Sequence, residues 1–229
     1  MKPGMLLITL LINCFFAFSQ TSNDPLGHRN IIDQASRNIL YTYQFEDVKG
    51  SPFLSDNWQP GILIYKNHSV FKNVKLKFDI KANEFIFNRN DSSFQLDANV
   101  TEVRLYPKQG DSLIFKNGYG FDKSLKPTKY LQVLAEGKIT FLKFIKKDIE
   151  EYNEYGDATK YKRFIDMYDY YIVKDSKTED IHLSKKTLQT LLADKWDKIS
   201  DYLSQYKLSG KDEKSFIAAI RYYNSSGAF

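Results

Sequence analysis

The sequence predicts an α+β protein in which antiparallel β-meander sheets are followed by C-terminal helices. Apolar and polar residues alternate along Asn73–Lys81 and along several later segments, as is typical of strands with one buried face. Short polar turns separate these segments, and such turns join antiparallel neighbours. After Leu183 the apolar residues recur every three or four positions, which indicates amphipathic helices.

The chain begins with the features of a signal peptide. Lys2 precedes an apolar run over residues 5–18, and the small residue Ser19 follows it. The run is shorter than the roughly 20 residues that span a bilayer as a helix. We therefore expect cleavage between Ser19 and Gln20, a periplasmic, outer-surface or secreted location, and no transmembrane segment in the mature chain. An uncleaved anchor and a lipoprotein attached through Cys14 are the alternatives.

Composition limits the chemistry of the mature chain. Cys14 is the one cysteine, so removal of the leader excludes thiol catalysis, disulfides and cysteine-ligated metals. The formal net charge of the full chain is +5, and its basic residues are interleaved with acidic ones. This pattern indicates a mixed solvated surface and no nucleic-acid partner.

Four parts are expected along the chain: a signal peptide at 1–19, an N-terminal segment at 20–40, an antiparallel β region at 41–183 and a helical region at 184–229. A short helix is expected over residues 31–40, with Asn30 as its N-cap.

The first strand group is clearest where Val74, Leu76, Phe78 and Ile80 alternate with polar residues, so these four side chains are expected in a core. The same pattern predicts strands at 61–65, 84–87, 94–96, 102–106 and 112–115.

The second strand group consists of two hairpins. Strands over 130–135 and 138–147 are joined at Glu136 and Gly137, and strands over 164–174 and 179–183 are joined at 175–177. Between the hairpins, the polar segment 150–161 is expected to be a mobile loop or a helical turn. The segment 141–145 is apolar on both sides, so the C-terminal helices are expected to cover its second face.

Two C-terminal helices are expected, with Ser184 and Ser209 as N-caps. Apolar positions from Leu188 to Leu203 place the first helix, and those from Phe216 to Tyr223 place the second.

The stretch GSPFLSDNWQPG at 50–61 has the composition of a structural corner, because prolines, glycines and Asp-Asn favour turns. Trp58 and Phe53 within it could instead stack against a sugar or peptide. Together with Tyr65 they are the candidate ligand-binding residues.

No catalytic, metal or cofactor motif stands out. His28, His68 and His182 lie far apart, without the spacing of a zinc site. The acidic group at 148–157 lacks the residue order of a calcium loop, although loose calcium binding there is an alternative. Phosphate-binding and nucleophile motifs are missing from the sequence. We therefore assign no catalytic residue, no metal ligand and no cofactor.

The pattern GSPFLxxxWxxG at 50–61, followed by Tyr65 and by FKNVKLKFD at 71–79, resembles a group of secreted proteins common in Bacteroidetes. The segments YLQVLAEGK at 130–138 and LSKK at 183–186 are similar to the same group. The resemblance implies an extracytoplasmic location and carries over no functional residue.

These observations favour an exported, non-catalytic envelope or secreted protein that binds another macromolecule, such as an envelope protein or a glycan. A carboxylate-dependent glycan hydrolase and a carrier of an apolar ligand are the alternatives.

Overall fold

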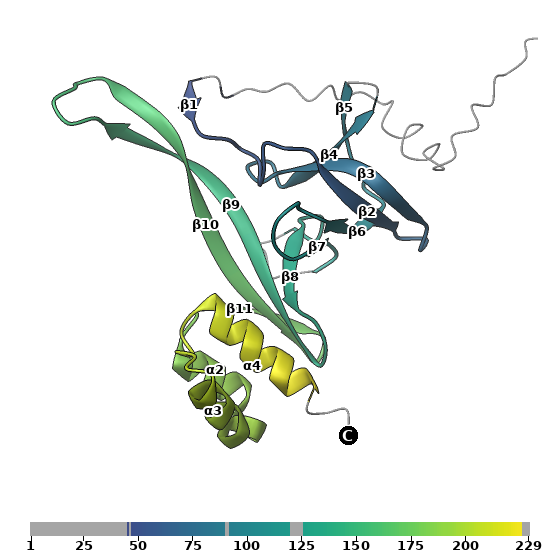
Figure 1. Cartoon of the computed structure of the whole chain (residues 1–229), viewed down its shortest axis with the longest axis vertical. Helices are drawn as coiled ribbons and strands as arrows, with labels where there is room; N and C mark the ends of the chain where they lie inside the picture. Colours follow the sequence, from purple (N-terminus) through teal and green to yellow (C-terminus); the bar gives the residue numbers. More distant parts are fainter. Residues whose placement is uncertain (1–44, 46, 90–91, 120–125, 226–229) are drawn as a thin grey trace, which may run out of the picture.

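The computed structural model describes residues 45, 47–89, 92–119 and 126–225. In this part the chain forms one mixed sheet of eleven strands and a group of C-terminal helices (Figure 1). The expected leader, its cleavage site and the helix at 31–40 lie outside the described residues. The strands are β1 (Val48–Lys49), β2 (Gln59–Tyr65), β3 (Val70–Asp79), β4 (Glu84–Arg89), β5 (Ser92–Gln95), β6 (Val100–Leu105), β7 (Leu113–Lys116), β8 (Leu131–Ala135), β9 (Ile139–Asn153), β10 (Lys160–Lys174) and β11 (Lys177–Ile181). The helices are α2 (Lys185–Leu191), the 3-10 turn η1 (Ala193–Lys195), α3 (Trp196–Gln205) and α4 (Glu213–Ser225).

The strand order departs from a simple antiparallel meander. Neighbours in sequence pair from β2 to β5 and from β6 to β11, but β6 returns to pair with β2, and β1 pairs with β10 in parallel. The prediction of an entirely antiparallel meander is therefore wrong in these two places. The nearly continuous apolar run of β2 suits a strand between two neighbours. β2 pairs with β3 along one edge and with β6 along the other.

β9 and β10 form one long hairpin arm whose outer end projects from the rest of the molecule (Figure 1), and β1 pairs with β10 near that end. Their register runs without a break from Asn153↔Lys160 to Ile139↔Lys174. The expected polar loop at 150–161 is therefore wrong at both of its ends, which belong to strands. Cross-strand partners explain the error: the ring centroids of Tyr152 and Tyr161 lie 5.8 Å apart. Opposite charges face each other on the same ribbon, so a polar sequence still forms favourable strand pairs.

The first core lies between the strands of the β2–β7 region. The predicted alternation in β3 is confirmed, since the side chains of Val74, Leu76, Phe78 and Ile80 are all buried. The ring of Phe78 stacks on Phe85 at a centroid distance of 4.4 Å. Alternate residues of β3 therefore hold one face of the sheet in the core.

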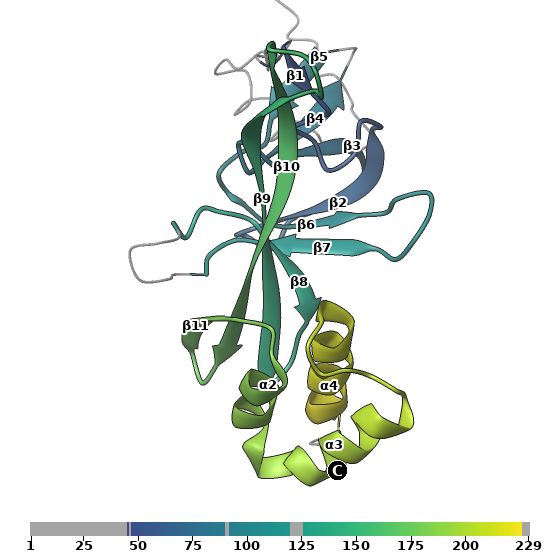
Figure 2. The same cartoon turned by 90° about the vertical axis from the view of Figure 1, so that its left-hand side faces the viewer.

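The second core joins the helices to one end of β8–β10, as Figures 1 and 2 show. Phe141 of β9 packs against Phe216 of α4, with ring centroids 5.7 Å apart. Asn224 clamps α4 to the start of β9, because its amide donates to Ile139 O at 2.8 Å and accepts from Ile139 N at 3.0 Å. The expectation that the helices cover a sheet face is confirmed at this end.

One of the two predicted N-cap residues is confirmed. Ser184 Oγ accepts from Thr187 N at 3.1 Å and caps α2, as expected. Asp212 caps α4 in place of Ser209, because its carboxylate accepts from Ser215 N at 2.8 Å. The first expected helix is also divided by η1. The division keeps apolar residues of both halves in the same core.

Candidate functional site

A cavity of about 440 Å³ lies where four connections of the sheet meet. Its walls come from the β3–β4 turn with the start of β4, the β5–β6 loop, the end of β7 and the segment that leads into β8. A larger hollow of about 640 Å³ lies over α3 and α4, but all its lining residues belong to those two helices. The smaller cavity is the better candidate, since separate segments bring several polar groups together there.

Asn83 and Tyr130 hold two of these walls together. Asn83 Nδ2 donates to Tyr130 O at 2.9 Å, and Tyr130 N donates to Asn83 Oδ1 at 2.8 Å. Asn83 sits in the left-handed region with φ 56°, a conformation that asparagine adopts more readily than most residues. Lys129 Nζ adds a hydrogen bond to Ala82 O at 2.8 Å. The β3–β4 turn is thereby fixed against the segment before β8.

The carbonyl of Val100 fixes a third wall. Tyr130 donates its hydroxyl proton to Val100 O at 2.7 Å, and Asn117 Nδ2 donates to the same oxygen at 2.9 Å. Both donors also line the cavity. The start of β6 and the end of β7 are therefore held at fixed positions beside the space.

Two carboxylates and two ammonium groups line the cavity: Glu84, Asp97, Lys66 and Lys129. Burial raises the pKa of Glu84 above its ordinary value of 4.5; the charge of Lys129 opposes this shift and that of Asp79 adds to it. Asp97 Oδ1 accepts from Asn99 N at 2.8 Å, so this carboxylate also organises the β5–β6 loop. The cavity thus offers charged groups of both signs beside apolar side chains.

Tyr65 is buried close to this cavity. Its side chain is 6 % exposed, and its hydroxyl has no hydrogen-bond partner within the described residues. Burial raises the pKa of the phenol, and the charge of Asp97 contributes to the shift. The hydroxyl therefore lies within electrostatic range of a residue that lines the cavity.

The structure brings together two of the three predicted ligand-binding residues. Lys77 Nζ lies 5.1 Å from the ring centroids of both Phe53 and Trp58, and both rings are half-buried. The ammonium group of Lys77 therefore already makes cation–π contacts with both aromatic rings. Tyr65 is packed in the first core instead. A ligand-binding role for these residues stays a prediction.

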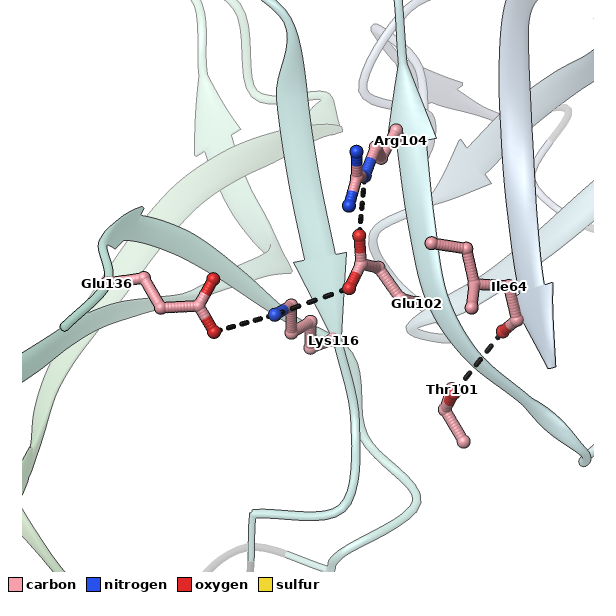
Figure 3. A network of polar contacts seen from close by, with 6 residues as sticks. All are labelled: Ile64, Thr101, Glu102, Arg104, Lys116 and Glu136. Carbon is pink, nitrogen blue, oxygen red and sulfur yellow. Dashed lines mark hydrogen bonds and ion pairs between the residues drawn. The ribbon is translucent and has the colours of Figure 1, made fainter. Parts of the chain in front are cut away.

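A chain of ion pairs supports the strands that carry the cavity (Figure 3). Glu102 of β6 contacts Arg104 Nε at 2.5 Å and Lys116 Nζ at 3.2 Å, and Lys116 also contacts Glu136 at 2.6 Å. Burial alone would lower the pKa of Lys116, but its hydrogen bond to Glu136 and the two carboxylate charges raise it above its ordinary value. Thr101, next to Glu102, lines the cavity and donates to Ile64 O at 3.3 Å.

The acidic residues on the arm form ion pairs with lysine and arginine side chains. Asp148 contacts Lys81 at 3.0 Å, Glu150 contacts Arg163 Nη2 at 2.7 Å, and Glu154 contacts Lys49 at 3.0 Å. Within the part of the chain that the structure describes, no group of three or more histidine, cysteine or acidic residues is placed to hold a metal ion. The alternative of calcium binding at 148–157 therefore has no ligand set in this structure.

Sequence reasoning missed the residues that line the cavity. Four of these residues, Glu84, Asp97, Asn117 and Lys129, belong to separate segments without a recognisable motif. Glu84 is the first residue of β4, and the other three lie just outside strands. Their shared feature is position at strand ends. This shared position could be recognised only after the strand order was known.

Comparisons with known protein families, with curated proteins and with solved structures found no match. The resemblance to secreted proteins of Bacteroidetes therefore stays a prediction. None of the helices among the described residues is long and apolar enough to cross a membrane.

Proposed function

We propose that this protein is an exported, non-catalytic binding protein, and that the cavity between the β3–β4 turn and the β5–β6 loop is its binding site. The observation that carries the proposal is the convergence of Glu84, Asp97, Asn117 and Lys129 on one space of about 440 Å³. This volume lies in the range of small-molecule sites, about 300–1,000 Å³. A macromolecular partner would therefore present one small unit to the cavity.

The hydrogen bonds around the cavity favour binding over a structural role alone. Asn83 and Tyr130 fix the walls through backbone partners, while Glu84 and Lys129 face the space. A site whose walls are held in place loses little conformational entropy when a ligand enters.

A filling variant tests the proposal. Ala98 is exposed and lines the cavity, so Ala98→Trp should occupy the space and keep the polar groups. Ala218→Trp in the hollow over α4 is the matched control. Saturation-transfer NMR with a mixture of monosaccharides, amino acids and fatty acids should give signals that A98W abolishes and A218W retains. Equal signals in the wild type and A98W would refute this site.

Export is part of the same proposal. It rests on the leader-like sequence at 1–19. Expression with the complete leader, followed by fractionation and N-terminal sequencing, should yield a product that begins at Gln20 outside the cytoplasm. A full-length product in the cytoplasm would contradict it.

Glycan hydrolysis is the second candidate function. One observation favours it: Glu84 and Asp97 line the same cavity, and burial raises the pKa of Glu84, as a general acid requires. Release of reducing ends from a polysaccharide panel, lost in both Glu84→Gln and Asp97→Asn, would support hydrolysis in place of simple binding. An apolar carrier is favoured less, because charged groups line the cavity.

A further inference from the structure

We infer that the cavity holds a neutral, hydroxyl-rich ring, and that its ligand class is a single sugar unit, free or at the end of a glycan. This inference rests on the proposed binding function and names its ligand.

Charge balance argues for a neutral ligand. The cavity lining contains two acidic side chains, Glu84 and Asp97, and two basic ones, Lys66 and Lys129. Lys129 already acts electrostatically on Glu84, so each compensates part of the other's charge. A ligand with a net charge would meet as much repulsion as attraction and would lose its own hydration on entry. An uncharged ligand avoids this cost.

Hydrogen-bonding capacity argues for hydroxyl groups. The ammonium of Lys129 has three donors and uses one on Ala82 O. Thr101 donates its hydroxyl hydrogen to Ile64 O, so its oxygen can accept a hydrogen bond from a ligand. The carboxylate of Glu84 accepts a hydrogen bond from the Gln95 side chain and keeps further acceptor positions. A hydroxyl group donates and accepts at once, and it can satisfy all three side chains, whereas an apolar ligand would leave them without water or partner.

Two further features fit a ring-sized ligand. Leu96, Ala98 and Pro127 supply apolar surface in the same lining, and the C–H face of a sugar ring is apolar. At about 440 Å³, the cavity is near the lower end of the range for small-molecule sites.

The test uses the full mature chain and three sets of probes: neutral saccharides (glucose, mannose, galactose, N-acetylglucosamine and their disaccharides), zwitterionic amino acids, and decanoic acid. Calorimetry and saturation-transfer NMR measure binding. We expect at least one neutral saccharide to bind, and Lys129→Met and Glu84→Gln each to weaken it by about tenfold, the loss of one or two hydrogen bonds to a charged group.

Matched variants keep folding apart from binding. Lys214→Met and Glu179→Gln carry the same changes at positions outside the cavity, and both should leave saccharide affinity unchanged. Circular dichroism must show that each variant is folded. Ala98→Trp is an independent test of the same cavity, because it fills the space and keeps the polar groups.

Each outcome has a separate meaning. Saccharide binding that is weakened by K129M and E84Q but not by K214M and E179Q supports the inference. Binding of amino acids or decanoic acid without any saccharide, lost in A98W, overturns the sugar assignment and leaves the proposed binding function intact. Saccharide binding that K129M, E84Q and A98W all leave unchanged overturns the inference and this site. No binding of any probe overturns both.

Discussion

Two neighbouring buried tyrosines should respond in opposite directions when their hydroxyl groups are removed. Tyr65 and Tyr130 are almost equally buried, with side chains 6 % and 8 % exposed. The Tyr65 hydroxyl has no hydrogen-bond partner within the described residues, whereas the Tyr130 hydroxyl donates to Val100 O at 2.7 Å. Tyr→Phe removes one oxygen atom in each case, so each variant is a control for the other.

The expected magnitudes follow from these partners. A buried hydroxyl without a partner costs about 1–3 kcal/mol, so Tyr65→Phe should stabilise the protein. A gain of about 2 kcal/mol corresponds to a Tm rise of about 4–8 °C for a chain of this size. Tyr130→Phe should destabilise by about 1 kcal/mol, a fall of about 2–4 °C, because Val100 O keeps its bond to Asn117.

Urea unfolding at pH 7, followed by far-ultraviolet circular dichroism, measures both changes. Burial raises the pKa of each phenol above its ordinary value of 10, so both are neutral at this pH and no ionisation enters the comparison. A loss of stability in Tyr65→Phe as large as that in Tyr130→Phe would show that the Tyr65 hydroxyl has a strong partner, and would refute the reasoning.

Three more predictions concern other parts of the molecule. Because burial raises the pKa of Glu84, its contribution to stability is fully present below the ordinary value of 4.5 and is lost as pH rises through the folded-state value. In urea unfolding from pH 4 to 7, the wild type should therefore lose stability relative to Glu84→Gln as pH rises. Asn224→Ala should cost about 1–3 kcal/mol, because it leaves the buried Ile139 backbone groups without their side-chain partner, and hydrogen exchange at Ile139 should speed up. Phe78→Ala, 1 % exposed, should cost about 3–5 kcal/mol in chemical unfolding; a cost below 1 kcal/mol would contradict the packing of the first core.

Local pattern in the sequence predicted most strands because burial of alternate residues is a local property. Val74 and Phe78 alternate with lysines and are buried in the structure. The change of period after Leu183 likewise marks the start of the helices. These signals need no knowledge of distant partners.

Strand order and the cavity could not be predicted in this way. The pairing of β6 with β2, and of β1 with β10, depends on which edges remain open after the nearer hairpins form, and periodicity carries no information on that choice. The strands at 138–147 and 164–174 were predicted, but the outer part of the arm was missed. Tyr152 and Glu150 are typical of loops until their partners Tyr161 and Arg163 are placed opposite them. Glu84 and Lys129 come together only through the same long-range register.

Opposite charges are arranged differently in the cavity and on the rest of the surface. On the arm, Lys147 Nζ and Asp166 Oδ1 are 3.1 Å apart, and in β6 the carboxylate of Glu102 contacts two cations directly. Such pairs satisfy each other and keep little capacity for a ligand. In the cavity, Lys129 acts on the charge of Glu84, and its Nζ donates a hydrogen bond to Ala82 O at 2.8 Å.

This difference matters for function. Side chains that compensate each other's charge across a space, without closing on one another, keep donors and acceptors for a third group. Direct ion pairs stiffen the strands around them, while the cavity walls that carry Glu84 and Lys129 are fixed by the bond from Lys129 to Ala82 O and by the Asn83–Tyr130 clamp. The walls are therefore fixed, and Lys129 and Glu84 each use only part of their hydrogen-bonding capacity on the protein, which is the combination that a preorganised binding site requires.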